Sequence, residues 1–357
     1  MTNEVILSSA PRGLLDAADI VDGILETLMT SERGRWTLID ENLGLPFDSL
    51  FAMVRSGGKR IRPALCYAAF IGSGGDQSDV TAQRVMTALE LLHTFALLHD
   101  DIMDGSSMRR GNLTVHEEFA AFHSKSNYRG ESRRFGDGVG ILAGDLAFVY
   151  ADIMIEDAPI EVRKIYSELR LEVNIGQYLD LLGTARCEPT VDMARKINIY
   201  KSGKYTIERP MHVGAVLCGK GQTELDQLSD FGLPLGEAFQ LQDDLLGVFG
   251  DDTLTGKPVG DDLREGKPTE LIAQTINLLD GNERKKFTEL FRHCQDSPDA
   301  IAEVMHAIED SGAKGQIEER IDLLIGESLR ALDNSFLNDI GKEMLREIAL
   351  YIAQRQN

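Results

Sequence analysis

Apolar residues recur at the spacing of an α-helix along most of this chain. In residues 14–30 they fall every three or four positions, which predicts an amphipathic helix. Residues 80–101 are apolar on most sides, as expected of a helix inside a bundle. The same pattern predicts further helices at residues 161–182, 193–201, 208–217 and 224–248, and from 268 to the C-terminus. Alternating strand-like runs are nearly absent and no repeat of fixed period is present, so the pattern predicts an all-α protein.

Polar and glycine-containing segments separate the predicted helices. A helix is expected to begin near Arg60, with a proline in its first turn, where a missing N–H costs little. Residues 124–138 (SKSNYRGESRRFGDG) predict a surface loop before the next helix. We expect residues 1–12 to be a flexible lead-in and residues 1–357 to form one large helical bundle, a single all-α domain.

The chain is strongly acidic. Its 58 Asp and Glu residues outnumber its 37 Lys and Arg residues, which gives a formal net charge of −21. A protein of this charge is a poor candidate for binding nucleic acid or an anionic membrane surface. The few basic residues inside the motifs described below therefore stand out as candidate anion-binding sites.

Neither a membrane span nor a disulfide framework is expected. The longest apolar stretch, residues 140–155, is interrupted by Asp145 and Asp152. No secretory signal pattern opens the chain. The four cysteines are widely spaced and form no CxxC pair: Cys66, Cys187, Cys218 and Cys294. Such thiols are typical of a reducing compartment, so a cytoplasmic location is predicted.

The stretch LLHTFALLHDDIMDGSSMRRG, residues 91–111, carries the first candidate chemistry. Asp100 and Asp104 stand four residues apart, so on a helix they share one face. Asp101 points about 100° away from Asp100 at roughly 3.6 residues per turn. Two carboxylates on one face repel each other unless a cation lies between them, and Mg²⁺ prefers such oxygen ligands. The alternative is an ordinary acidic helix end in solvent.

A second acidic stretch, GEAFQLQDDLLGVFGDDTLTGKPVGDDLREGKP, spans residues 236–268. Asp243 and Asp244 follow a helical run that contains Gln240, and a loop with Lys257 and Lys267 comes next. Two aspartate-bearing helix ends facing one cavity could hold several Mg²⁺ ions bridged by pyrophosphate and stabilise a phosphorylated leaving group. The alternative is a charged surface hairpin.

Two short basic stretches are candidate phosphate sites. In SGGKRIRP, residues 56–63, the glycines allow a close backbone approach while Lys59 and Arg62 supply charge. In YKSGKYT, residues 200–206, the Lys201 and Ser202 side chains could reach phosphate oxygens. Taken alone, either stretch could equally be a solvated helix end.

Histidines and competing motifs narrow the choice. His93 lies two helical turns before Asp100 on nearly the same face, which makes it a second candidate for the site, although it could also be a buried structural histidine. His212 and His306 lie among apolar residues and are predicted to be ordinary core or surface residues. Walker A, EF-hand, HExxH and GxSxG patterns are absent from the sequence.

The order and separation of these motifs resemble the polyprenyl synthase family, the trans-isoprenyl diphosphate synthases, and within it geranylgeranyl diphosphate synthases of actinobacterial type. The motifs are GGKRIRP, DDIMDGSSMRRG, QDDLLG and GKPVGDDLREGK, and the resemblance covers nearly the whole chain. It implies an all-α fold around a deep central cavity, in a homodimer. It also implies head-to-tail condensation of isopentenyl diphosphate with an allylic diphosphate, with the departing pyrophosphate accepting the proton.

The resemblance also implies roles for individual residues. The expected metal ligands, for three Mg²⁺ ions per active site, are Asp100, Asp104 and Asp243. The expected contacts of isopentenyl diphosphate are Lys59, Arg62, His93 and Arg110. Those of the allylic diphosphate are Arg109, Lys201, Ser202, Gln240, Lys257 and Lys267. Among all of these, the residues expected to act in catalysis are Asp100, Asp104, Arg109, Lys201, Asp243 and Lys257.

One position departs from the family pattern. The second motif usually reads DDxxD, but here it reads DDLLG, so Gly247 lacks the last carboxylate. Asp251 and Asp252 are the candidates to replace it.

The length of the product is expected to depend on residues one turn before Asp100. In the family a bulky side chain there stops growth of the prenyl chain; Phe95 is bulky and Ala96 is small. This combination most resembles a geranylgeranyl diphosphate synthase, with a farnesyl or longer-chain synthase as the alternative. A class I terpene cyclase and a non-catalytic prenyl synthase subunit are further alternatives.

Overall fold

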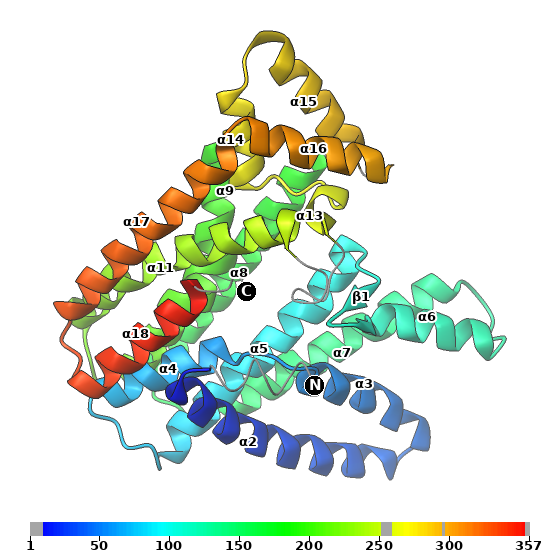
Figure 1. Ribbon diagram of the computed structural model, residues 1–357. Helices are drawn as coiled ribbons and strands as arrows, with labels where there is room; N and C mark the ends of the chain where they lie inside the picture. Colours follow the sequence, from blue (N-terminus) through cyan, green and yellow to red (C-terminus); the bar gives the residue numbers. More distant parts are fainter. Residues whose placement is uncertain (1–9, 251–258, 295–296, 354–357) are drawn as a thin grey trace.

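The computed structural model describes residues 10–250, 259–294 and 297–353, which are almost entirely helical (Figure 1). The helices of the first half are α2 (Arg12–Thr37), η1 (Glu41–Leu43), α3 (Gly44–Arg55), α4 (Ile61–Gly72), α5 (Val80–Asp104), α6 (Val115–Lys125), α7 (Ser132–Ile155) and α8 (Ile160–Arg186). Those of the second half are α9 (Val191–Ile197), η2 (Asn198–Glu208), α10 (Arg209–Leu217), α11 (Gln222–Phe249), α13 (Asp261–Arg264), α14 (Glu270–Leu278), α15 (Gly281–His293), α16 (Pro298–Asp310), α17 (Ala313–Asp333) and α18 (Asp339–Ala353). The short strands β1 (Met108–Arg109) and β2 (Asn112–Leu113) pair as an antiparallel hairpin. The all-α prediction is confirmed.

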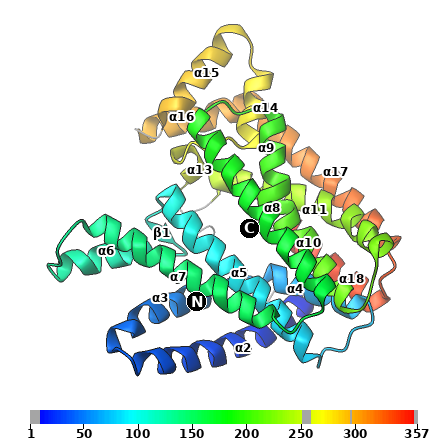
Figure 2. The same cartoon turned by 180° about the vertical axis from the view of Figure 1, so that it is seen from behind.

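Helix α5 lies near the middle of the molecule and faces α11 and α13 (Figures 1 and 2). Buried apolar residues form two clusters, one around α2, α4, α5, α7 and α8, the other around α14 to α17. Helix α11 belongs to both: Phe231 and Leu235 lie in the first cluster, Leu241 and Val248 in the second. One continuous helix therefore joins the two cores and carries the second acidic motif between them.

Two of the predicted boundaries were wrong. Residues 124–138 were expected to be a loop, but α6 continues to Lys125 and α7 already begins at Ser132. The glycine at 136 is a packing site inside α7: a Cβ there would lie 2.1 Å from the carbonyl oxygen of His116. Glycine in this segment therefore permits close helix packing where the sequence suggested a break. At the N-terminal end, α2 begins at Arg12, inside the predicted lead-in, whose residues 1–9 lie outside the described range.

The sequence predicted a break between helices after Lys201. The structure has none there, because the helix continues through the π-helix η2. Glycines on two neighbouring helices make room for this wider turn. A Cβ at Gly176 of α8 would lie 2.4 Å from the backbone nitrogen of Lys201, and one at Gly236 of α11 would lie 2.5 Å from Cα of Gly203. Because π-turns insert an extra residue into a helix and often occur at functional sites, η2 is a notable element.

The end of α5 and the hairpin after it position the first acidic motif. The Asp79 side chain accepts a hydrogen bond from the backbone N–H of Ala82 and caps the start of α5. Gly105 ends the helix in the left-handed conformation, at φ 67°. Arg110 and Gly111 both have positive φ between the paired strands, as the tight hairpin turn requires. The turn brings the Arg109 side chain back toward α5.

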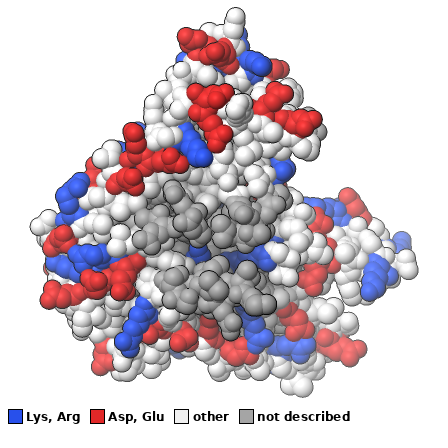
Figure 3. Space-filling view, viewed as in Figure 1, with Lys and Arg blue, Asp and Glu red and all other residues white. Residues whose placement is uncertain are grey.

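Helix α7 is long and apolar enough, by length and composition alone, to cross a membrane. Core helices of soluble proteins have the same composition, and α7 packs against α5 through its small residues: a Cβ at Gly144 would lie 2.3 Å from the His99 ring. On the face of the molecule in Figure 3, the described acidic and basic side chains are interspersed, without a continuous basic strip. None of the four cysteines, all of which lie in the described residues, forms a disulfide bond.

Candidate active site

A cavity of about 1230 Å³ lies between α5, η2 and α11. Its lining contains most of the side chains expected from the sequence: Lys59, Arg62, His93, Phe95, Ala96, Asp100, Arg109, Arg110, Lys201, Ser202, Gln240, Asp243 and Lys267. Asp104 lies beside this lining and contacts Lys267. Lys257, Asp251 and Asp252 lie outside the described residues. The two acidic motifs, distant in sequence, thus open into the same cavity.

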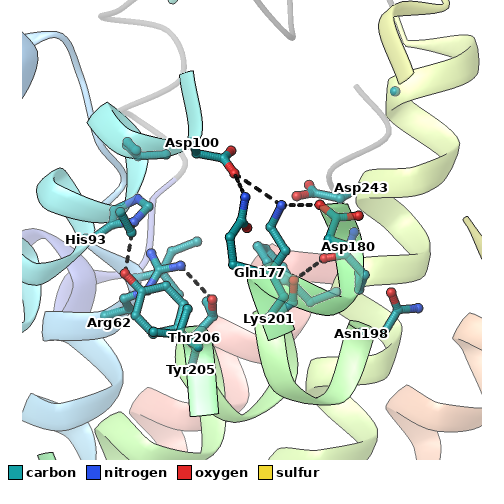
Figure 4. Close-up of a pocket in the computed structure, with 18 of the residues that line it drawn as sticks. Arg62, His93, Asp100, Gln177, Asp180, Asn198, Lys201, Tyr205, Thr206 and Asp243 are labelled. Carbon is teal, nitrogen blue, oxygen red and sulfur yellow. Dashed lines mark hydrogen bonds and ion pairs between the residues drawn. The ribbon is translucent and has the colours of Figure 1, made fainter. Parts of the chain in front are cut away.

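Asp100 enters the cavity from α5 and Asp243 enters from α11, with Lys201 of η2 between them (Figure 4). The Lys201 Nζ atom lies 3.2 Å from Oδ1 of Asp100 and 2.5 Å from Oδ2 of Asp180. Gln177 donates a hydrogen bond of 2.8 Å to the same Asp100 oxygen. Although burial opposes its charge, the Asp100 and Asp180 carboxylates raise the pKa of Lys201. This lysine therefore remains a cation in the cavity.

Asp104 and Asp100 form the acidic face that their spacing predicts. Burial, followed by repulsion from Asp100, raises the pKa of Asp104 to about 6. Lys267 lies close by: its Nζ is 3.5 Å from Oδ2 of Asp104 and 2.5 Å from Oε2 of Glu265. The two carboxylates therefore still repel each other despite this lysine, which is the condition that a divalent cation relieves.

Asp101 points away from the cavity, as its helical position predicts. Its Oδ1 accepts a 2.7 Å hydrogen bond from Nε of Arg109 and forms an ion pair with Nη2 of the same arginine at 2.6 Å. Burial raises the pKa of Asp101 even though this arginine opposes the shift. The pair holds the Arg109 guanidinium at the edge of the cavity, where it can contact an anion.

Only one carboxylate oxygen of Asp244, in the second acidic motif, has a hydrogen-bond partner among the described residues. Gln240 donates a 2.7 Å hydrogen bond to Oδ1 of Asp244 and accepts one from Ser202. Oδ2 of Asp244 is buried and has no partner among the described residues. Burial raises the pKa of Asp244 well above its usual range, and Asp262 and Asp243 add to the effect. An unpaired buried carboxylate oxygen beside a cavity is a site where a cation fits.

The other end of the cavity is basic. Arg62 of α4 donates a 2.6 Å hydrogen bond to Thr206 and lies over the Tyr205 ring, 4.2 Å from its centroid. Its Nε is buried without a partner among the described residues. Burial and then the charges of nearby arginines, led by Arg62 and Arg110, lower the pKa of His93 well below its usual range. This concentration of positive charge can attract and hold an anion.

Consecutive basic residues at the start of α4 have different roles. Arg60 is 6% exposed and points into the protein, where it donates to Glu90 at 2.7 Å and to Asp22 at 2.8 Å. Lys59 and Arg62 line the cavity, and Arg60 also reaches its lining although its guanidinium is engaged by these carboxylates. Arg60 takes the left-handed conformation, with φ 49°, just before the helix. The sequence analysis selected Lys59 and Arg62 as anion contacts, but it did not show that Arg60 between them is paired with Glu90 and Asp22.

Phe95 lies on the cavity wall one turn before Asp100. The centroid of its ring lies 4.6 Å from that of the His99 ring and 4.8 Å from that of the Phe148 ring of α7. The Arg170 guanidinium lies over the Phe148 ring, 5.2 Å from its centroid. Phe95 is therefore supported from behind by a second aromatic ring, while Ala96 leaves space beside it.

Several cavity residues were not identified from the sequence. Gln177 and Asp180 come from α8, and Asn198, Tyr205 and Thr206 come from η2. The spacing of Gln177 and Asp180, three residues apart, would place both on one helical face, and this was the available signal. The residues of η2 could not have been placed, because a π-turn changes which side chains share a face. His212 and His306, predicted to be ordinary core or surface residues, are buried and exposed respectively, and neither lines the cavity.

The carboxylates offer a partial metal site. Among the described residues, no three His, Cys, Asp or Glu side chains are grouped closely enough to hold a metal ion alone. Asp100 and Asp104 on one side, and Asp243 and Asp244 on the other, provide hard oxygen ligands around a shared space. This donor set fits Mg²⁺, which typically uses one or two carboxylates and completes its coordination with substrate phosphates.

Comparison with known proteins agrees with this arrangement. Residues 47–308 match the family model described as polyprenyl synthetase. The chain is 31% identical over 315 residues to geranylfarnesyl diphosphate synthase of Aeropyrum pernix, which covers 85% of this chain and 92% of that protein. It is 36% identical over 227 residues to geranylgeranyl diphosphate synthase of Mycobacterium tuberculosis, covering 62% and 59% of the two chains.

A solved structure shares the whole fold. The geranylgeranyl pyrophosphate synthase of Corynebacterium glutamicum, crystallised with isoprenyl diphosphate and magnesium, superposes with a TM-score of 0.85 and 35% identity. The match covers 95% of this chain and 98% of that one. With a family model spanning most of its length and both acidic motifs in one cavity, this chain belongs to the polyprenyl synthetase family and is a trans-prenyltransferase.

Proposed function

We propose that this enzyme condenses isopentenyl diphosphate with allylic diphosphates and releases geranylgeranyl diphosphate. The observation that carries the proposal is the division of one cavity into an acidic end and a basic end, with Phe95 on the wall one turn before Asp100. Two diphosphate substrates need two anion sites. Only the allylic diphosphate has to ionise, by breaking its C–O bond. A terpene cyclase, which takes a single diphosphate, has no use for the basic end.

The acidic end suits the allylic diphosphate. Lys201, Arg109 and Lys267 are cations already held beside carboxylates, so they can donate to diphosphate oxygens without being brought in from solvent. Three Mg²⁺ ions, held by Asp100, Asp104 and Asp243, would supply the charge that stabilises pyrophosphate as it departs. The hydrogen bond from Ser202 to Gln240 holds these two side chains in place at the acidic end.

The basic end suits isopentenyl diphosphate. Lys59, Arg62, His93 and Arg110 line it. The unpartnered Nε of Arg62 and the cluster of arginine charges both favour a diphosphate there. Held at this end, the alkene carbon of isopentenyl diphosphate attacks the allylic carbon as its C–O bond breaks. The new C–C bond forms, a proton leaves, and the departing pyrophosphate accepts it.

The apolar wall has two tasks. It excludes water, which would otherwise convert the allylic cation to an alcohol. It also limits how far the product can extend, because Phe95 is backed by the Phe148 ring. Ala96 leaves space on the neighbouring side. This combination of one bulky and one small residue supports the geranylgeranyl product over farnesyl or longer chains.

We further propose that the enzyme acts as a homodimer in the cytoplasm. Helices α7 and α8 are joined by the Arg170–Asp152 ion pair at 2.7 Å, and both are visible from behind in Figure 2. Their outer side carries exposed apolar residues, here called the α7–α8 face: Ile141, Leu142, Val149, Leu171, Ile175 and Tyr178. Apolar residues in such number normally mark a protein interface, and a second copy of the same two helices would cover them. The free cysteines agree with a reducing compartment.

The test is a product assay. Purified enzyme is incubated with Mg²⁺, labelled isopentenyl diphosphate and, separately, the dimethylallyl, geranyl and farnesyl primers, and the products are sized by chromatography. We expect geranylgeranyl diphosphate from each primer, and no turnover of a primer without isopentenyl diphosphate. Turnover without it would indicate a cyclase, and inactivity of the purified chain alone would indicate a subunit that needs a different partner.

A further inference from the structure

The last position of the second acidic motif is filled from elsewhere in the chain. Gly247 of α11 has no side chain, and the carboxylate of Asp262 occupies the space beside it. A Cβ built on Gly247 would lie 1.9 Å from Oδ2 and 2.4 Å from Cγ of Asp262, far inside the 3.4 Å at which ordinary contacts begin. A side chain at position 247 would therefore have to displace the Asp262 carboxylate from the place that it occupies here.

Asp262 is held there by packing. It lies in the short helix α13, which begins after Gly260 in the left-handed conformation, at φ 73°. The next residue, Leu263, is 1% exposed and belongs to the second apolar cluster. A buried leucine directly after Asp262 anchors α13 against α11, so the carboxylate is presented from a fixed element.

The surroundings of Asp262 are those of the metal-binding end. Asp262 and Gly247 line the same cavity as Asp243 and Asp244. Lys267 Nζ lies 3.6 Å from Oδ1 of Asp262 and 3.5 Å from Oδ2 of Asp104, so one lysine lies between the two sides of the site. Asp244 belongs to the same lining as Asp262, and its buried Oδ2 has no partner among the described residues, so a cation would fit beside it.

We propose that Asp262 supplies the carboxylate that the DDLLG motif lacks and supports the divalent cation bound by Asp243. This carboxylate comes from α13, the short helix packed against the helix that carries the motif. This replacement differs from the one expected from sequence, where Asp251 and Asp252 were the candidates. The proposal rests on the proposed function, in so far as the site takes a divalent cation together with a diphosphate.

The test measures metal binding directly. The full-length protein is titrated with Mn²⁺ in the presence of inorganic pyrophosphate, and binding is followed by calorimetry and by the electron paramagnetic resonance signal of free Mn²⁺. We expect Asp262→Asn, which keeps the shape but removes the charge, to weaken Mn²⁺ binding about 10- to 100-fold, the usual effect of losing a supporting group at a metal site. Asp230→Asn, an exposed carboxylate on the same helix α11, should bind like the wild type.

A reciprocal exchange makes the test specific. In an Asp262→Ala background, Gly247→Asp returns a carboxylate to the motif and should restore most of the lost affinity, whereas Gly247→Ala should not. In the wild-type background, Gly247→Ala alone should weaken binding, because its methyl group displaces Asp262. Circular dichroism and thermal unfolding confirm that each variant is folded.

The outcomes separate two failures. Unchanged Mn²⁺ affinity in Asp262→Asn, or equal restoration by Gly247→Ala and Gly247→Asp, would overturn the assignment of Asp262. If the wild-type protein itself binds no Mn²⁺ with pyrophosphate, the proposed function fails, and the role of Asp262 fails with it.

Discussion

The Lys201 ammonium group lies 3.2 Å from a carboxylate oxygen of Asp100, although the two residues belong to helices far apart in the chain. The same lysine contacts Asp180 at 2.5 Å. Lys201 is thus held in place before any substrate arrives, at the point where a diphosphate and its metal ions would meet the first acidic motif. Such preorganised charge costs little reorganisation when the C–O bond breaks.

Lys201→Gln should therefore lower kcat by about 10²- to 10³-fold, the usual effect of removing one group that stabilises a developing anion. Steady-state kinetics with a saturating allylic primer measures it. Lys196→Gln is the matched control, since Lys196 is exposed and its ion pair, at 2.6 Å, is with Asp192 one helical turn away. An equal loss in both variants would contradict a specific role for Lys201.

Phe95→Ala should lengthen the product by at least one isoprene unit, because removing the ring opens the wall supported by Phe148. The measurement is chromatographic sizing of products from the farnesyl primer. Phe122→Ala controls for the loss of an aromatic ring, since Phe122 packs in α6 against Phe119 and Tyr128 and does not line the cavity. An unchanged product from Phe95→Ala would mean that another residue stops chain growth.

Leu142→Glu combined with Leu171→Glu should dissociate the proposed dimer. These side chains are 62% and 61% exposed on the α7–α8 face, and charges there would remain unpaired when a second copy covers it. Light scattering after size-exclusion chromatography gives the mass. Leu323→Glu, equally exposed at 62% but on α17, should leave the mass unchanged. A wild-type monomer would refute the dimer outright.

Arg60→Ala should reduce the free energy of unfolding by about 3 to 5 kcal/mol, because it leaves the buried Glu90 carboxylate without its cation. Both side chains are nearly inaccessible, at 5% and 4% exposure. Urea denaturation measures the change. Adding Glu90→Gln to Arg60→Ala should recover part of the loss, since the uncompensated charge is then gone. Equal stability of the single and double variants would mean that the pair is not coupled.

His212 should make the protein less stable in acid. Burial, moderated by Glu208, lowers the pKa of His212 to about 4 from its usual 6.5. Its Nε2 lies 3.0 Å from the Leu225 carbonyl oxygen, to which the neutral ring donates, and its Nδ1 accepts from Arg209 at 3.2 Å. Between pH 6.5 and 4 the unfolded chain therefore binds a proton that the folded chain does not.

The free energy of unfolding should consequently fall as pH drops through this window, by at most about 1.4 kcal/mol per pH unit from this residue. Urea midpoints between pH 4 and 7 measure the slope. His212→Asn should flatten it, and His306→Asn, at an exposed histidine, should not. The same slope in wild type and His212→Asn would assign the acid sensitivity to other groups.

The spacing of residues along the sequence was enough to predict most of the long helices and the orientation of the first acidic motif. The helical period predicted α5, α8 and α11 within a few residues at each end, and it predicted the start of α2 but not its continuation to Thr37. It also placed Asp100 and Asp104 on one face with Asp101 turned away. These features depend on residues three or four positions apart, which lie close together in any helix whatever surrounds it. The motif residues that the structure describes likewise lie in or directly beside one cavity.

Tertiary packing decided the rest. The π-turn that aims Lys201 into the site exists because Gly176 and Gly236 on two other helices make room for it. Asp262 occupies the place left by Gly247 because Leu263 anchors α13 against α11. These contacts join residues that only the folded chain brings together. A sequence read along its length shows which charges are present, and the packing of helices determines which of them meet.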